Sequence, residues 1–175
     1  MRYRRADVVD RAIRGLDEHG LEALSMRRLA ADLGVQPSAL YHHFPDKRAL
    51  LAAVADEVLA RGRRATEVMT WDGELELVCV ELRDAMLAHR DGDRLIASVN
   101  AEGIGAGEPE ARMADALRRG GADERLARVG ARTLLHYVLA HVDAEPGDFA
   151  LGLAVVLDGL TARLARERTG YFSSR

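Results

Sequence analysis

Apolar side chains recur along almost the whole chain at the spacing of one helix face. Val9, Ala12, Ile13 and Leu16, for example, stand at positions i, i+3, i+4 and i+7, on one side of a helix. No segment shows the alternation of apolar and polar residues that a half-buried strand requires, and no internal repeat is visible. The sequence therefore predicts an all-α fold of about nine helices.

Capping residues and helix breakers divide this pattern into separate helices. Ser25 is a suitable N-cap for a helix that Gly34 ends, and Pro37 fits the first turn of the short helix that follows. Asp46 and Asp148 are the expected N-caps of two further helices. The predicted helices cover about 5–17, 26–33, 37–44, 46–64, 75–86, 95–99, 108–119, 123–142 and 148–167.

Composition limits the class of protein. The chain has 175 residues, of which 48% are hydrophobic and 30% charged, a balance typical of a globular protein rather than a disordered one. Its single cysteine, Cys79, cannot form an internal disulfide. The first residues lack the apolar run of a signal peptide, and no apolar stretch is long enough to span a membrane. We therefore expect a soluble, cytoplasmic protein.

The net charge of −3 hides an uneven distribution. Residues 1–64 hold 12 Lys and Arg against 9 Asp and Glu, for a charge of +3. The remainder holds 13 against 19, for a charge of −6. A basic N-terminal third agrees with a nucleic-acid partner but is too weakly charged to indicate one alone.

Residues 26–44 have the pattern of a helix-turn-helix, with two short helices joined by a turn that contains Gly34. In this motif the second helix enters the major groove of DNA. Leu40 and Phe44, four residues apart, are expected to pack inward. Arg27 and Lys47 stand at helix starts, where a cation suits a phosphate oxygen. The residues of the second helix expected to face DNA are Gln36, Ser38, Ala39, Tyr41, His42 and His43.

The same region resembles the N-terminal DNA-binding domain of the TetR family of transcriptional regulators. The resemblance rests on the stretches 9–12, 19–30 and 33–35, and above all on Ala39-Leu40-Tyr41-His42-His43-Phe44-Pro45-Asp46-Lys47-Arg48-Ala49-Leu50-Leu51. It implies a homodimer that places each three-helix unit over one half-site of a double-stranded DNA operator. The positions that match the family's DNA contacts are Arg27, Gln36, Pro37, Ser38, Tyr41, His42, His43 and Lys47.

Roles within this set differ. We expect Tyr41 and Lys47 to hold phosphates, and Gln36, Ser38 and His42 to meet base edges. His42 and His43 could instead be metal ligands, but neighbours on a helix diverge by about 100° and make a poor chelating pair. No metal site and no cofactor is therefore expected.

The C-terminal part resembles the tetracycline-repressor subfamily, through residues 87–92 and 149–160. The resemblance implies a DNA-binding domain over 1–47 and an effector-binding and dimerisation domain over 48–170, connected by the helix 46–64. The helices 123–142 and 148–167 would then form a four-helix bundle with a second copy.

The effector implied by that subfamily does not fit this sequence. Alignment on His89-Arg90-Asp91-Gly92 places the tetracycline- and magnesium-binding positions, where His, Asn, Phe, His, Thr and Arg are expected, on Arg63, Val78, Leu82, Ile96, Val99 and Asn100. Ile96 cannot ligate a metal and Val78 cannot donate an amide hydrogen bond. We therefore expect a different, largely apolar small molecule. Its predicted contacts are Val78, Leu82, Met86, Ile96, Val99, Asn100, Met113, Leu117 and His136. Each of these apolar residues could instead be ordinary core.

These features predict a ligand-responsive DNA-binding regulator, most simply a repressor, and leave its effector, its operator and the sign of regulation open. A DNA-binding protein of cell division or chromosome organisation is an alternative. A helical enzyme would need a site built from His89, His136 and His141 with Asp91 or Asp143. Since no nucleophile elbow, phosphate loop or metal-ligand spacing is present, we expect no enzyme.

Overall fold

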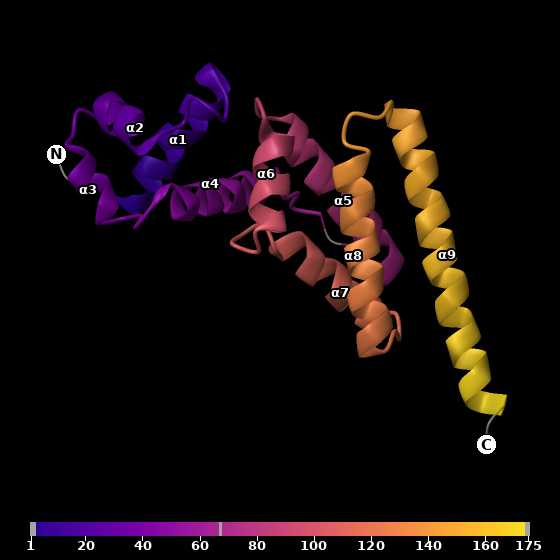
Figure 1. The fold of residues 1–175 in the computed structure, drawn as a ribbon. Coiled ribbons are helices and arrows are strands. Elements are labelled where there is room, and N and C mark those ends of the chain that lie inside the picture. The colour runs from indigo at the N-terminus through magenta and orange to yellow at the C-terminus, as the bar shows by residue number, and fades with distance from the viewer. Residues whose placement is uncertain (1–2, 67, 174–175) are drawn as a thin grey trace. The chain divides into compact units, whose positions relative to one another are not determined.

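The computed structural model describes residues 3–66 and 68–173, with side chains to 166. Over these residues the chain forms nine α-helices and no strand, as the sequence predicts (Figure 1). The helices are α1 Arg5–His19, α2 Met26–Leu33, α3 Pro37–Tyr41, α4 Lys47–Gly62, α5 Trp71–Leu87, α6 Gly92–Ala101, α7 Glu108–Arg119, α8 Glu124–Ala140 and α9 Pro146–Ser173.

The chain divides into two compact units. The first unit comprises Met1–Arg63 and Asp84–Gly107, and the second comprises Arg64–Arg83 and Glu108–Arg175. This division differs from the predicted boundary near residue 47 because it follows packing, and α4 packs on α1 and on α6. The boundary between DNA-binding and effector-binding parts stays a functional prediction.

The first unit is built around the apolar faces of α1 and α4. In α1, Val9, Ala12, Ile13 and Leu16 are all buried, which confirms the stripe read from the sequence. Helix α2 packs against α1 and α3 packs against α2. The short α3 is thereby held on the core of the unit rather than standing alone, which a five-residue helix could not do.

Local caps set several of the helix ends where the sequence predicts them. The Ser25 hydroxyl accepts a hydrogen bond from the N–H of Arg28 at 3.2 Å, and Gly34 closes α2 in the left-handed region with φ 66°. The Asp46 carboxylate accepts one from the N–H of Ala49 at 2.8 Å. These side chains satisfy helix amides that would otherwise lack a partner.

Several predicted ends differ from the structure: α5 begins at Trp71 rather than near Leu75, α6 begins at Gly92 rather than near Leu95, and α9 continues to Ser173. Helix α3 stops at Tyr41 instead of reaching Phe44. The carbonyl of Leu40 accepts from the N–H of His43 three residues on as well as from that of Phe44 four residues on, and the chain turns there. Helix α9 begins at Pro146, so Asp148 lies inside its first turn and is not the N-cap. Proline suits a first helical position because its missing N–H would have had no helical partner.

Polar contacts join the turn after α1 to the turn before α6. Gly20 ends α1 with φ 81° and ψ 171°, and a Cβ there would lie 2.7 Å from Oδ2 of Asp91. The same carboxylate accepts a hydrogen bond from the N–H of Leu21 at 2.9 Å, which lowers the pKa of Asp91. Nδ1 of His89 lies 3.1 Å from the Asp17 carboxylate. These contacts fix the C-terminal end of α1 against α6 within the first unit.

In the second unit α8 packs between α7 and α9. A Cβ on Gly130 would lie 2.8 Å from Leu117 of α7 and 3.1 Å from Leu160 of α9, so the missing side chain allows close approach. The Tyr137 hydroxyl donates to the carbonyl of Phe149 at 2.7 Å, and its ring lies against Gly152 of α9. Figure 1 shows α8 and α9 running side by side.

The second unit also buries one carboxylate and the single thiol. Glu81 is 5% exposed and accepts hydrogen bonds from Arg112 and from the N–H of Arg64, both at 2.7 Å. Burial raises the pKa of Cys79 to about 12, which supports a packing role for this residue. Over the described part of the chain, no helix is long and apolar enough to cross a membrane.

Candidate nucleic-acid interface

The second helix of the helix-turn-helix is anchored by two side chains and exposes the others. Leu40 and Phe44 are each 1% exposed, which confirms that they pack inward. Tyr41, between them in sequence, is 52% exposed. A helix held by one apolar side can present its other side to a groove of DNA without losing its position.

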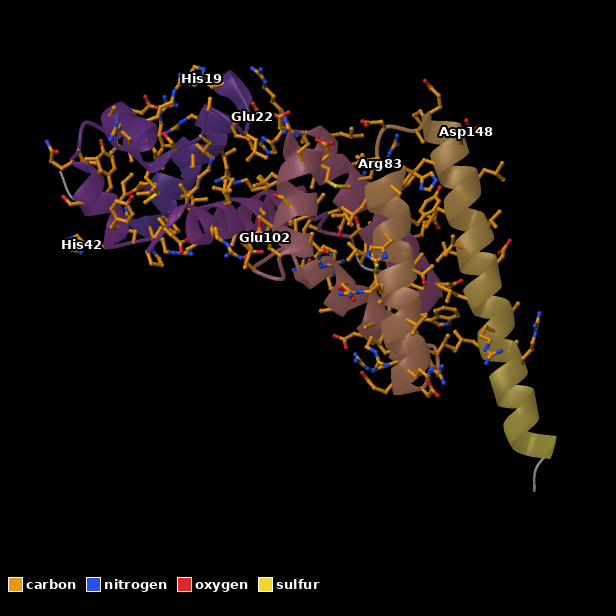
Figure 2. All side chains as sticks on the ribbon, in the orientation of Figure 1. His19, Glu22, His42, Arg83, Glu102 and Asp148 are labelled. Atoms are coloured by element: carbon orange, nitrogen blue, oxygen red, sulfur yellow. The ribbon has the colours of Figure 1, made fainter. Side chains whose placement is uncertain are left out.

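All eight predicted DNA-contacting residues lie in the first unit, six of them on or beside α3. Gln36, Ser38, Tyr41 and His42 are exposed, and Pro37 and His43 are half-buried. In Figure 2 the His42 side chain lies at the outer end of this unit, and Glu22 and Glu102 lie at the opposite end. The acidic side chains labelled there are thus separated from the predicted DNA-facing surface.

Cations flank α3 on both sides. Arg27, in the first turn of α2, and Lys47, the first residue of α4, are both exposed. Neither forms an ion pair with any residue that the structure describes. By contrast, Arg48 is engaged by Glu102 at 2.8 Å. Arg27 and Lys47 therefore keep their charge available, and their binding of a phosphate stays a prediction.

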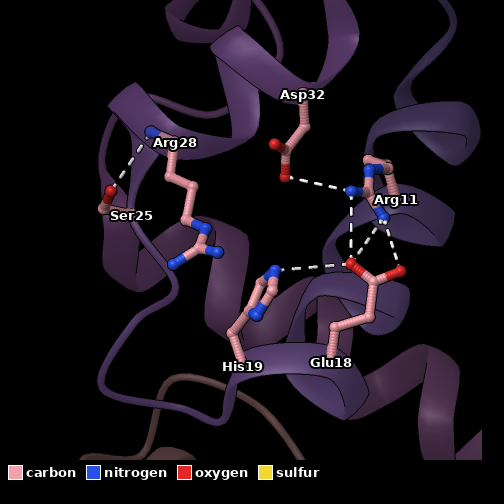
Figure 3. A network of polar contacts seen from close by, with 6 residues as sticks. All are labelled: Arg11, Glu18, His19, Ser25, Arg28 and Asp32. Atoms are coloured by element: carbon pink, nitrogen blue, oxygen red, sulfur yellow. Dashed lines mark hydrogen bonds and ion pairs between the residues drawn. The ribbon is translucent and has the colours of Figure 1, made fainter.

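Arg28, next to Arg27 on α2, is a further exposed cation that the sequence analysis did not select. Figure 3 shows its backbone N–H bonded to Ser25 while its guanidinium extends without an ion pair among the described residues. Nearby, Arg11 of α1 pairs with Glu18 of its own helix at 3.3 Å and joins α1 to α2 through Asp32 at 3.2 Å. Only the tertiary structure distinguishes an engaged arginine such as Arg11 from an available one such as Arg28.

Some of the backbone amides at the helix starts of this surface already have partners. At the start of α2 one amide is taken by Ser25, and at the start of α4 one is taken by Asp46. The Asp46 carboxylate also places a negative charge beside Lys47. A phosphate at the start of α4 would meet the Lys47 ammonium as its charged donor.

The predicted effector-contacting residues are mostly buried core, and they fall in both units. Met86, Ile96, Val99 and Asn100 belong to the first unit, and the others belong to the second. Asn100 is half-buried, and His136 is exposed in a surface hollow on α8. Those that are at most 1% exposed are Val78, Leu82, Met86, Ile96, Val99, Met113 and Leu117. Their role in ligand binding stays a prediction.

The histidines of the enzyme alternative have separate surroundings. His89 is held by Asp17 in the first unit, whereas His141 stacks on Tyr137 in the second with ring centroids 4.6 Å apart. Asp91 is occupied by the N–H of Leu21. Across the residues that the structure describes, no three His, Cys, Asp or Glu side chains form a candidate metal site.

Comparison with known proteins shows the family of this chain. Residues 8–54 match the family described as bacterial regulatory proteins, tetR family. A Mycobacterium tuberculosis protein, the HTH-type transcriptional repressor Rv1474c, is 33% identical over 168 residues, which cover 93% of this chain and 82% of that protein. The chain belongs to the TetR family. Its relatives are DNA-binding regulators and not enzymes.

Other TetR-family proteins are similar over different extents. The class A tetracycline repressor of Escherichia coli is 40% identical over 117 residues, or 64% of this chain, which spans only about half (51%) of that repressor. The Mycobacterium smegmatis BioQ structure has a TM-score of 0.84 at 37% identity and covers 91% of this chain and 99% of its own. A BioQ structure with its double-stranded DNA operator has a TM-score of 0.80 at 38% identity, over the same shares.

Proposed function

We propose that this TetR-family chain is a homodimeric transcriptional repressor that a small, largely apolar effector releases from a palindromic DNA operator. Residues 1–47 would bind DNA, residues 48–170 would bind the effector and dimerise, and α4 would connect the two parts. The observation that carries the proposal is the exposed face of α3, flanked by the available cations Arg27 and Lys47. A related protein, BioQ, has been solved with its DNA operator.

Dimerisation through α8 and α9 is supported by apolar side chains that these helices leave uncovered. Val129 of α8 is 53% exposed, and Leu151 and Val155 of α9 are 68% and 65% exposed. Leu151 and Val155 are four residues apart and so lie on one face of α9. Large exposed apolar side chains grouped in this way are typical of a surface that another protein covers. A second copy would present the same surface and bury both.

The proposed effector is a lipophilic molecule other than magnesium-tetracycline. Arg63, Val78 and Ile96 stand where the tetracycline-repressor subfamily is expected to have His, Asn and His, which supports a ligand other than magnesium-tetracycline. The many apolar side chains among the predicted contacts favour a lipophilic molecule. Such a ligand releases DNA only if it binds more tightly to a state of the dimer that fits the operator poorly.

Selection of DNA from a random library tests the regulator. The purified full chain should enrich palindromic duplexes, and its affinity should fall as salt is raised, because bound Lys and Arg release counterions from the phosphates. Lys47→Ala should weaken binding to selected and unrelated duplexes by the same factor, since it contacts phosphate and not base. Loss of two such contacts in a dimer should lower the slope of log affinity against log salt by about 1.8.

Arg14→Ala is the matched control. Arg14 is exposed on α1 and forms no ion pair within the described residues, yet it is not among the predicted DNA contacts. Its removal should leave the salt slope unchanged. If the wild-type chain enriches no duplex, or binds all duplexes equally, the proposed function is wrong. If Lys47→Ala changes base preference instead of uniform affinity, the role assigned to Lys47 is wrong.

A further inference from the structure

A cluster of basic side chains at the start of α1 adjoins the α3 surface. Arg4 and Arg5 are both exposed, and Arg4 forms no ion pair with any residue in the described part of the chain. The Arg4 N–H donates to the Asp7 carboxylate at 2.7 Å, which fixes where α1 begins. Figure 1 shows this end of the chain next to α3, and Tyr3 borders a hollow that α3 also lines.

The Arg5 guanidinium is held in place by the recognition motif itself. Its Cζ lies 4.7 Å from the centre of the Phe44 ring, on which it stacks. Phe44 is 1% exposed and directly follows His42 and His43, so its ring cannot move without disturbing the core of the unit. A cation–π contact of this kind does not use the N–H donors of the guanidinium, which remain able to form hydrogen bonds. Arginine is the residue that can both stack in this way and donate two hydrogen bonds to a phosphate.

Local helix stability does not account for these arginines. Cations at the N-terminal end of a helix are opposed by the helix dipole, and α1 has only Asp7 as an acidic residue in its first turn. These arginines destabilise the start of their own helix, and Arg5 is nevertheless held in place by Phe44. Such a residue is expected at a binding site.

The hollow beside these residues is continuous with the predicted DNA-binding surface. Its volume is about 430 Å³, and its lining includes Tyr3 together with Ala39, His42 and His43 of the recognition motif. Its rim therefore carries a phenol and two imidazoles, groups that can hydrogen-bond a phosphate or a sugar oxygen. The arginines and this rim together form an electropositive, hydrogen-bonding strip beside α3.

We propose that Arg5, positioned by Phe44, binds a backbone phosphate of the operator strand that passes over this hollow, outside the bases read by α3. The contact rests on the proposed DNA-binding function and adds to it a phosphate grip from the segment Tyr3–Arg5. It orients α3 in the groove without reading sequence, and it increases the affinity for every duplex alike.

Arg5→Gln tests the contact, with Arg14→Gln on the same helix as its control. The probes are the duplex that the wild-type chain selects from a random library and a scrambled duplex of equal length. A dimer that loses two phosphate contacts should show a salt slope about 1.8 lower, while Arg14→Gln keeps the wild-type slope. The ratio of wild-type to Arg5→Gln affinity should then shrink about 12-fold between 50 and 200 mM salt, a fourfold change acting through that difference in slope.

Neutral methylphosphonate linkages, substituted one at a time along the selected duplex, locate the phosphate. One linkage outside the α3 bases should weaken wild-type binding and leave Arg5→Gln unaffected, because that variant has already lost the contact. Arg5→Lys, which keeps the charge, should retain the wild-type slope and the same sensitive linkage. If Arg5→Gln fails to fold, Arg5→Met, which keeps an apolar stem against Phe44 and removes the charge, should show the same lower slope and the same loss of linkage sensitivity.

The outcomes separate this inference from the proposed function. If the wild-type chain selects no duplex, the proposed function fails. If it selects one and Lys47→Ala lowers the slope, but Arg5→Gln behaves like Arg14→Gln, the function stands and the Arg5 contact is wrong. The contact is equally wrong if no single linkage distinguishes the wild type from Arg5→Gln.

Discussion

Replacing Gly20 by alanine should destabilise the first unit far more than replacing Gly34, although both glycines end a helix. Gly34 has φ 66° and ψ 32°, a left-handed conformation, and a Cβ added there would have no atom within 4 Å. Gly20 has φ 81° and ψ 171°, a region that essentially only glycine occupies, and its Cβ would lie 2.7 Å from Asp91 and 3.2 Å from Arg90.

The magnitudes follow from these two environments. Alanine at Gly34 meets only the left-handed penalty, partly offset by a stiffer unfolded chain, for a net cost of about 1 kcal/mol. Alanine at Gly20 adds backbone strain of about 1–3 kcal/mol to a steric overlap of about 1–3 kcal/mol, so we expect about 2–6 kcal/mol. Equilibrium unfolding in urea, followed by far-ultraviolet circular dichroism, gives both differences.

A double-mutant cycle isolates the steric part. In an Asp91→Ala background the nearest obstacle to a Cβ on Gly20 is gone, so Gly20→Ala should cost about 1–3 kcal/mol less than in the wild type. Equal costs for Gly20→Ala and Gly34→Ala, or an unchanged cost of Gly20→Ala without Asp91, would refute the reasoning.

Three further predictions concern other parts of the chain. Gly152→Ala should lower the free energy of unfolding by about 1–2 kcal/mol in urea titration, because the new Cβ displaces Tyr137, although alanine favours the helix. Val155→Asp should convert the dimer to a monomer in light scattering, because it puts a charge on the proposed interface. Arg11 donates to Glu18 and lowers its pKa, a stabilisation that is lost as pH falls through that lowered value. The wild-type excess in urea midpoint over Arg11→Gln should therefore shrink between about pH 7 and about pH 3.

Each of these has a matched control. Gly147→Ala, where a Cβ would meet open space, should leave stability nearly unchanged, and an equal loss there would contradict the Gly152 argument. Ala150→Asp, exposed on another side of α9, should leave the dimer intact, and dissociation by it would mean that Val155 has no special place. A pH-independent difference between the wild type and Arg11→Gln would show that the Glu18 pair does not stabilise the fold.

The sequence predicted best the features that depend on near neighbours. Ser25 and Gly34 bound α2 correctly because a cap and a left-handed glycine act within one turn of the residues they serve. The start of α9 at Pro146 was missed because Asp148 and Pro146 are both good helix starts, and local rules do not choose between them.

Contacts between residues far apart in the sequence could not be predicted from the sequence. The carboxylate of Asp91 accepts a hydrogen bond from the N–H of Leu21, which lies 70 residues away in the sequence. Neither segment contains a sequence pattern that indicates this partner. Arg5 and Phe44 meet only after α1 has packed on the rest of the unit. The predicted DNA-facing side chains could be chosen because Leu40 and Phe44 define an inner side of the motif. The effector contacts could not be tested in this way, since helical spacing marks core and ligand-lining side chains alike.

The buried thiol of Cys79 has a practical consequence. Because the thiolate is the reactive species, a residue that is 0% exposed with a pKa of about 12 reacts with a disulfide reagent only when its surroundings open. The rate at which Cys79 is labelled under native conditions therefore measures how often the second unit opens. Any compound that binds the closed form lowers this labelling rate by a factor of one plus its concentration divided by its Kd. The chain's only cysteine could thus report its effector from a library of candidates, with no operator in the assay.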